Sequence, residues 1–229
     1  MNALTIDSLQ FRWPNNTKPV LDLASFALAP GESVLLKGPS GIGKSTLLSA
    51  IAGVINIPAN AVSVAGTDVG TLSGSARDRF RVDHLGLVFQ VFNLLPWLNT
   101  LDNVLLPCRF SKRRRDRAGH DPQETARALL TDLGLGDPAL MSAPASTLSV
   151  GQQQRVAAAR ALIGAPELIL ADEPTSALDE ATKHQFVELL MRECAQAKAA
   201  LLFVSHDTGL EQHFDRVVDF RDLNRGASA

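Results

Sequence analysis

A run of nine residues, GPSGIGKST, has the residue types and the spacing of a phosphate-binding loop. The run comprises Gly38, Pro39, Ser40, Gly41, Ile42, Gly43, Lys44, Ser45 and Thr46. Its glycines allow successive backbone N–H groups to face one phosphate, and Lys44 adds a full positive charge. The Ser45 hydroxyl is an oxygen ligand of the kind that Mg²⁺ prefers. Because an apolar run precedes the loop and a helical pattern follows it, we expect a nucleotide phosphate and Mg²⁺ here, not a chance glycine-rich loop.

Two carboxylates follow the apolar run LILA in the segment ELILADEP. Adjacent buried carboxylates are unfavourable unless a cation or a proton compensates them. A Mg²⁺ ion near Ser45 supplies such a cation, so we expect Asp172 on the metal side of the site. We expect Glu173 to accept a proton from an attacking water molecule, as general base. Taken alone, the pair also fits a strand end that exposes two acids to solvent, but the phosphate-binding loop favours the catalytic interpretation.

The segment LSVGQQQR places Ser149, Gly151 and Gln152 where an alanine-rich helix is predicted to begin. Free N–H groups and the positive end of the helix dipole favour a phosphate at this point. A serine in this position is also an ordinary helix cap. The two interpretations are compatible, since both use the same N–H groups. We interpret the glutamines as a polar lining of the site.

Short apolar runs rich in Leu, Val and Ile alternate with helical patterns along the chain. Such runs are typical of parallel strands that are covered on both faces of a sheet. They lie at residues 33–38, 85–90, 167–174 and 200–206. Residues 179–199 predict one of the intervening helices. The alternation predicts an α/β fold with a mostly parallel sheet.

The N-terminal part of the chain and its middle have different patterns. The N-terminal part predicts short antiparallel strands, whereas residues 91–161 carry much helix signal and little strand signal. We therefore expect a single domain over residues 1–229. Its α/β core, with the antiparallel β part, comprises 1–90 and 162–229, and a helical subdomain at 91–161 is inserted between them.

Composition and charge exclude several classes of protein. The 229 residues are 45% hydrophobic and 20% charged, as in an ordinary soluble globular protein. A formal net charge of -2 gives no overall attraction to nucleic acid or to an acidic membrane surface. Cys108 and Cys194 fit neither a zinc site nor a disulfide framework. The sequence shows no signal peptide and no apolar run long enough to cross a bilayer, so we expect any membrane crossing to belong to another chain.

Taken together, the motifs resemble those of the ABC (ATP-binding cassette) ATPases, in the order in which that family carries them. LSVGQ resembles the LSGGQ signature, with Val150 in place of its first glycine. Gln90 lies where the family has its Q-loop glutamine, SALD at 176–179 resembles the D-loop, and His206 resembles the switch histidine. The resemblance covers nearly the whole chain and implies the P-loop ABC ATPase fold.

The resemblance also implies a role for each matched residue. Gln90 is expected to sense Mg²⁺ and water, and to complete the metal site with Ser45 and Asp172. His206 is expected to contact the γ-phosphate and the attacking water. ATP held by a second cassette is expected to contact Ser149 and Gly151, and Gln152 and Asp179 are also expected to bind ATP. The side chain of Val150 then has to point away from that nucleotide.

Two aromatic residues near the N-terminus compete for the adenine base. Trp13 lies where the family carries an aromatic residue that stacks on adenine. Phe11, two residues away, is its rival, and either ring also suits the hydrophobic core. We favour Trp13 because indole has the larger face for stacking.

The segment LGLVFQVFNLLPWLNTLDNVLLP is most similar to cassettes of the lipoprotein-release, macrolide-export and cell-division group. The resemblance implies an ATP-binding and ATP-hydrolysing subunit that forms a homodimer around ATP and drives a separate membrane permease, with export favoured. It implies a cytoplasmic place on the inner face of the cytoplasmic membrane. The alternative is an ABC ATPase of non-transport cell-division or cell-wall machinery. A soluble ABC ATPase of translation or DNA repair is less favoured, and no nucleic acid partner is expected.

Two segments of the sequence can each be interpreted in more than one way. NLLPW at 93–97 lies where the family docks the coupling helix of the permease, or else Leu94, Leu95 and Trp97 pack inside the helical subdomain. The basic run KRRRDR at 112–117 fits a solvated helix or loop. Its alternative is contact with anionic lipid heads or with a permease. A nucleic-acid role is less favoured, because no aromatic residues interleave the arginines.

Overall fold

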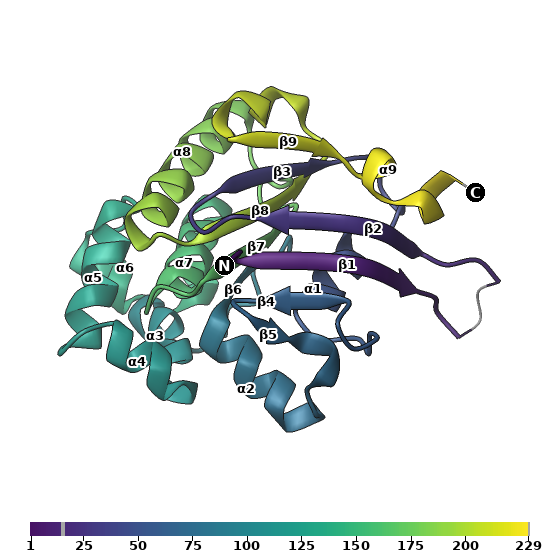
Figure 1. Cartoon of the computed structure of the whole chain (residues 1–229). Helices are drawn as coiled ribbons and strands as arrows, with labels where there is room; N and C mark the ends of the chain where they lie inside the picture. The colour runs from purple at the N-terminus through teal and green to yellow at the C-terminus, as the bar shows by residue number, and fades with distance from the viewer. Residues whose placement is uncertain (15–16, 229) are drawn as a thin grey trace.

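Nine strands in two sheets are present in the computed structural model, which describes residues 1–14 and 17–228 (Figure 1). The strands are β1 (Leu4–Phe11), β2 (Leu21–Leu28), β3 (Ser33–Lys37), β4 (Val62–Val64), β5 (Thr67–Asp68), β6 (Leu85–Val88), β7 (Leu168–Asp172), β8 (Ala200–Ser205) and β9 (Arg216–Asp219). The α-helices are α1 (Lys44–Ile51), α2 (Gly74–His84), α3 (Thr100–Phe110), α4 (Lys112–Arg117), α5 (Pro122–Asp132), α6 (Pro138–Ser142), α7 (Val150–Leu162), α8 (Glu180–Ala197) and α9 (Phe220–Leu223). Short 3-10 helices are η1 (Val69–Thr71), η2 (Ala145–Thr147), η3 (Thr208–His213) and η4 (Arg225–Ser228). The order of elements confirms the predicted α/β class.

The larger sheet is parallel throughout, in the order β6-β7-β8-β3-β9. Its side chains alternate between two hydrophobic cores, as the two-residue period of a strand requires. Leu35 and Ile169 belong to the core beneath the helices, whereas Leu36 and Leu170 belong to the core beneath the smaller sheet. The prediction of parallel strands at the four apolar runs is confirmed. The edge strand β9 was not predicted, because it is short and incompletely buried.

The smaller sheet is antiparallel, in the order β2-β1-β4-β5. β1 and β2 pair from Leu4 opposite Leu28 to Phe11 opposite Leu21, with a break in the register at Ser8. Their buried side chains pack with those of α1 against the parallel sheet. The predicted antiparallel strands at the N-terminus are confirmed, and β4 and β5 extend the sheet.

Helices α3 to α7 lie together on one side of the parallel sheet, at the left of Figure 1. Val104, Leu130 and Val156, from three of these helices, share one continuous core with Ile169 of the sheet. The structure describes every residue between β6 and β7, and they form helices and loops but no strand, as expected. The boundaries of a helical subdomain at 91–161 stay a prediction. None of the described helices combines the length and the apolar character that crossing a bilayer requires.

The basic run forms α4, and one of its arginines is buried. The Arg114 side chain, in a residue only 1% exposed, donates to the carbonyl oxygens of Ile163 (2.5 Å), Leu85 (3.0 Å) and Ala161 (2.7 Å). Burial lowers the pKa of Arg114 to about 10, so the guanidinium stays charged at neutral pH. Because the end of a helix leaves carbonyls without intrahelical partners, Arg114 supplies the donors that the end of α7 lacks. The prediction of a solvated or lipid-contacting run is therefore wrong for this residue.

The neighbouring arginines of α4 meet a single carboxylate at the start of β7. Arg113 and Arg117 both bind Glu167, the latter at 2.6 Å, and Nδ1 of His84 at the end of α2 lies 3.0 Å from the same carboxylate. Burial opposes ionisation of Glu167, but hydrogen bonds from His84, Arg113 and Arg117 outweigh it and lower its pKa. The positive charge of α4 is therefore largely used to join α2, α4 and β7.

Candidate functional site

The residues predicted to do chemistry meet at the carboxyl ends of four neighbouring parallel strands. β6 leads to Gln90, β7 to Asp172 and Glu173, β8 to His206, and β3 to the glycine-rich loop at 38–46. Parallel strands present their carboxyl ends at one edge of the sheet, which is where such folds bind ligands. Groups that are far apart in the sequence are therefore brought to one place.

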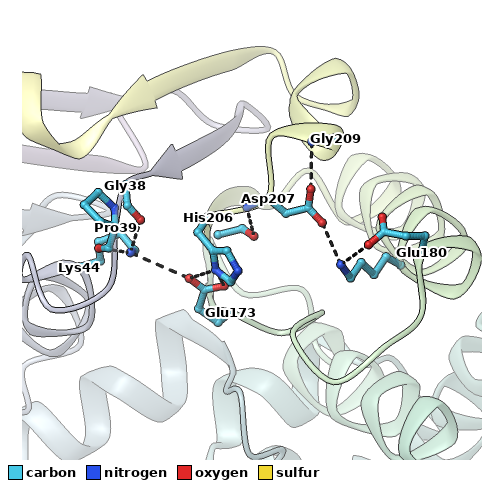
Figure 2. Close-up of polar contacts among 10 residues, drawn as sticks. Gly38, Pro39, Lys44, Glu173, Glu180, His206, Asp207 and Gly209 are labelled. Carbon is cyan, nitrogen blue, oxygen red and sulfur yellow. Dashed lines mark hydrogen bonds and ion pairs between the residues drawn. The ribbon is translucent and has the colours of Figure 1, made fainter.

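The glycine-rich loop turns the chain from β3 into α1. Gly43 precedes α1 with a φ of 106°, a left-handed conformation that glycine adopts without a steric penalty. A Cβ atom at this position would lie 3.0 Å from the carbonyl oxygen of Val20. Lys44, which is 6% exposed, folds back so that Nζ donates to the carbonyls of Gly38 (2.7 Å) and Pro39 (2.9 Å; Figure 2). These two hydrogen bonds therefore hold the Lys44 side chain against the glycine-rich loop.

The acid pair lies beside this lysine. Burial raises the pKa of Asp172, a hydrogen bond from Ser45 opposes the rise, repulsion by Glu173 adds to it, and the charge of Lys44 opposes it. Glu173 has a φ of 46°, in the left-handed region that a side chain adopts only with strain. Its Oε1 lies 3.9 Å from Lys44 Nζ, and its two carboxylate oxygens lie 3.1 and 3.0 Å from Nδ1 of His206 (Figure 2). The acid lies between the lysine and the histidine; its role as general base stays a prediction.

One hollow joins these groups to the N-terminal part of the chain. Its lining includes Trp13, Ser40, Ser45, Thr46, Gln90 and Asp172. Ser45, Gln90 and Asp172 offer hydroxyl, amide and carboxylate oxygens, which are the ligands that Mg²⁺ prefers, so this donor set fits the ion. The side chain of Ile42 packs against the core instead, so only its backbone is available to a phosphate.

The two aromatic candidates for base stacking have different surroundings. Trp13 lies just beyond β1, is 41% exposed and lines the hollow. Phe11 ends β1 and packs against the core, with its ring centroid 4.9 Å from that of Trp13 in an edge-to-face contact. This placement favours Trp13 over Phe11 as the residue that meets a base.

The LSVGQ segment forms the start of α7, with Ser149 as the N-cap. The backbone N–H of Ser149 donates to Oε1 of Gln152 at 2.8 Å, and the N–H of Gln152 donates to Oγ of Ser149 at 3.3 Å. This reciprocal pair is a capping box, so the interpretation of Ser149 as a helix cap is confirmed. Contact of the same helix start with a phosphate stays a prediction.

A second hollow lies at the start of α7. Its lining includes Ser149, Val150, Gly151, Gln152, Asp179 and Thr182. Asp179 caps α8 by accepting hydrogen bonds from the backbone and the hydroxyl of Thr182, at 3.0 and 2.7 Å. Val150 is 48% exposed at this hollow. Within the described part of the chain, no residue lines both this hollow and the one at the glycine-rich loop, so the two sets are separate on one copy.

One residue of the glutamine run has a role that the sequence interpretation missed. Gln154 is fully buried, and its Nε2 donates to the carbonyl of Pro174 at 2.6 Å. Among the described residues, its Oε1 is a buried side-chain acceptor without a partner. Gln154 therefore ties the first turn of α7 to the residue after Glu173 and is not a polar lining. The only indication of this role in the sequence is that Gln154 falls on the face of the helix that is turned toward the core.

Comparison with known proteins supports the family that the sequence motifs resemble. The family model described as ABC transporter matches residues 21–176. The lipoprotein-releasing system ATP-binding protein LolD of Novosphingobium aromaticivorans is 42% identical over 202 residues, which are 88% of this chain and 88% of that protein. The macrolide export ATP-binding/permease protein MacB of Chromobacterium violaceum is 39% identical over 96% of this chain but only 33% of that protein.

Comparison with solved structures supports the same family. A dimeric, post-hydrolysis structure of the ATP-binding cassette MJ0796 bound to ADP and Pi matches with a TM-score of 0.81 and 32% identity. The match covers 97% of this chain and 95% of that chain. The chain therefore belongs to the ABC transporter family, and it is an ATPase of that family.

Proposed function

We propose that this chain is the ATP-binding and ATP-hydrolysing subunit of an ABC transporter, and that two copies enclose two ATP molecules head to tail. The separation of the two hollows carries this proposal. One hollow has Lys44 and Asp172, whereas the other has Ser149 at the start of α7. A head-to-tail pair sets each helix start against the glycine-rich loop of the partner. The similarity to the dimeric cassette MJ0796 supports this pairing.

The glycine-rich loop binds the phosphates of ATP in this proposal. Lys44 exchanges the carbonyls of Gly38 and Pro39 for the β- and γ-phosphate oxygens. Trp13 stacks on the adenine ring. Mg²⁺, when bound, neutralises phosphate charge, and its proposed ligands are Ser45, Gln90 and Asp172.

Hydrolysis then depends on the acid and the histidine. Glu173 accepts a proton from water as the water oxygen attacks the γ-phosphorus, and ADP leaves with the electrons of the broken bond. His206 holds the attacking water and the γ-phosphate in line. Ser149 and Gly151 of the second copy bind the same γ-phosphate through their helix start, so hydrolysis requires the dimer.

Glu173→Gln tests the function directly. The amide cannot accept the proton, so ATP turnover is expected to fall about 10²–10⁴-fold, the usual contribution of a general base. ATP binding is retained, so the variant accumulates as an ATP-bound dimer in light scattering after size exclusion. Lys44→Ala is the matched control, and it is expected to lose both ATP binding and dimer formation. Normal turnover by Glu173→Gln would refute the assignment of the base.

We propose further that a membrane permease docks beside the Gln90 loop, on the inner face of the cytoplasmic membrane. Val91 and Trp97 are 75% and 73% exposed there, whereas Leu94 packs against the core. The docking interpretation therefore suits the exposed residues, and the packing interpretation suits Leu94. The names of LolD and MacB, one a lipoprotein-releasing and the other an export protein, support a transporter that works outward.

Capture of the partner separates transport from its alternative. Tagged Glu173→Gln, loaded with ATP, is purified from solubilised membranes of its own host, and the bound proteins are identified by mass spectrometry. An integral membrane permease in stoichiometric amount is the expected result. Recovery of cell-division or cell-wall proteins without a transport phenotype on gene deletion would favour the non-transport alternative. Recovery of ribosomes or repair proteins alone would refute the membrane assignment.

A further inference from the structure

The first turns of α8 are tied to the residue that follows His206 by an ion pair. Nζ of Lys183 lies 3.0 Å from Oδ2 of Asp207 and 2.7 Å from Oε1 of Glu180 (Figure 2). The side chains of Lys183 and Asp207 are 16% and 21% exposed, whereas that of Glu180 is 74% exposed. Hydrogen bonds to Glu180 and Asp207 raise the pKa of Lys183, and the bond from Lys183 lowers the pKa of Asp207. Both partners are therefore charged at neutral pH.

His206 depends on its neighbours in the chain for its position. Its side chain is 63% exposed, and it contacts the carboxylate of Glu173. On one side, Ser205 is buried at the end of β8 and accepts a hydrogen bond from the Asp207 N–H at 3.1 Å. On the other side, Asp207 accepts from the Gly209 N–H at 2.9 Å with one carboxylate oxygen and binds the lysine with the other. The backbone at His206 is thus held between β8 and the ion pair.

The helix that carries Lys183 also reaches the second hollow. Asp179 caps α8 and lines that hollow, and Lys183 follows four residues later, one helical turn along. Beside the ion pair, Nδ1 of His184 lies 2.9 Å from Nε2 of His213, at the end of η3. Two adjacent contacts therefore hold α8 to the segment after His206.

We propose that Lys183 is a positioning residue for ATP hydrolysis. By holding Asp207 against α8, it keeps His206 at Glu173 and links the surface that meets the second copy to the acid that activates water. The inference rests on the proposed function, since it requires His206 and Glu173 to act in hydrolysis. A salt bridge with a merely structural role would stabilise the protein without changing the rate of the bound complex.

Three variants of the full chain separate these roles. Lys183→Met keeps most of the length of the side chain and removes its charge, Lys183→Arg keeps the charge, and Glu180→Gln removes only the charge of the exposed partner. For Lys183→Met we expect kcat to fall about tenfold and KM for ATP to stay within about twofold, because a displaced catalytic contact lowers the rate without weakening ground-state binding. Lys183→Arg is expected to recover most of kcat, and Glu180→Gln to match the wild type. Unchanged kcat in Lys183→Met would overturn the inference.

The imidazole resonance of His206 supplies a readout that does not depend on turnover. The Cε1–H signal, assigned by its loss in His206→Ala, is expected to move in Lys183→Met and to stay in place in Glu180→Gln. A fall in kcat with an unmoved His206 signal would show that Lys183 acts by another route and would overturn the inference. Failure of the proposed function has a different signature, because His206→Ala would then hydrolyse ATP at the wild-type rate whatever the result for Lys183.

Discussion

Replacing Arg114 by methionine tests whether a buried arginine holds the end of α7. Methionine fills much of the same space but has no donors, so the carbonyls of Leu85, Ala161 and Ile163 lose a charged partner. Hydrogen bonds to charged groups contribute about 1.5–3 kcal/mol each, so three contribute about 4.5–9 kcal/mol. Burial of the guanidinium opposes this by several kcal/mol, a penalty that the variant no longer has. We therefore expect the free energy of unfolding to fall by about 3 kcal/mol.

Urea unfolding followed by circular dichroism measures this difference, with an unchanged slope as the sign that the unfolded state is the same. Arg115→Met is the matched control, because Arg115 lies on the exposed face of the same helix. The control is expected to stay within about 0.5 kcal/mol of the wild type. Equal stability of Arg114→Met and Arg115→Met would refute the reasoning, because the hydrogen bonds of Arg114 would then only balance the penalty of burying its charge.

Three further variants test the ion pairs of Glu167 and the base contact. Glu167 has a lowered pKa in the folded protein, so its stabilisation is present above the unfolded-state pKa of about 4.3 and is lost as pH falls through the lower folded value. The stability difference between wild type and Glu167→Gln is therefore expected to be largest at pH 7 and to shrink below about pH 5 in urea unfolding, and a constant difference would contradict this account. Trp13→Ala is expected to raise KM for ATP about tenfold with little change in kcat in steady-state assays. Phe11→Leu is expected to lower stability instead, and the reverse pattern would reassign the base contact to Phe11.

The placement of the candidate site residues could be predicted from the sequence where it depends on adjacent residues. The phosphate-binding loop brings Lys44 and Ser45 together within a few positions, and the acid pair follows its strand directly. Parallel strands could be predicted because residues buried on both faces leave a continuous apolar run. Each group was therefore expected at a strand end, and the sheet order then brought Gln90 and His206 to the same edge.

Roles that depend on a distant partner could not be predicted. Nothing in KRRRDR distinguishes Arg114 from its neighbours until α4 is packed with one face toward the end of α7. Gln154 and Lys183 likewise acquire their roles from Pro174 and Asp207, which lie about twenty residues further along the chain. The position of a charged or amide residue in a helical sequence shows only which face of the helix it occupies. Tertiary packing then decides which residue it contacts.

The common edge at which the parallel strands end also decides where the chain can change over evolutionary time. Gln90, Glu173 and His206 follow their strands so closely that one inserted residue would displace the group by about 3.3 Å and reverse the faces of its strand. The opposite edge carries connections such as the turn at Gly31 and the helix end at Lys198, which are distant from this chemistry along every strand. Insertions and deletions are therefore expected to be purged between each of these strands and its functional residue, and to be tolerated better at the amino ends of the strands. The tolerance of this fold to inserted residues therefore differs between the two ends of the same strand.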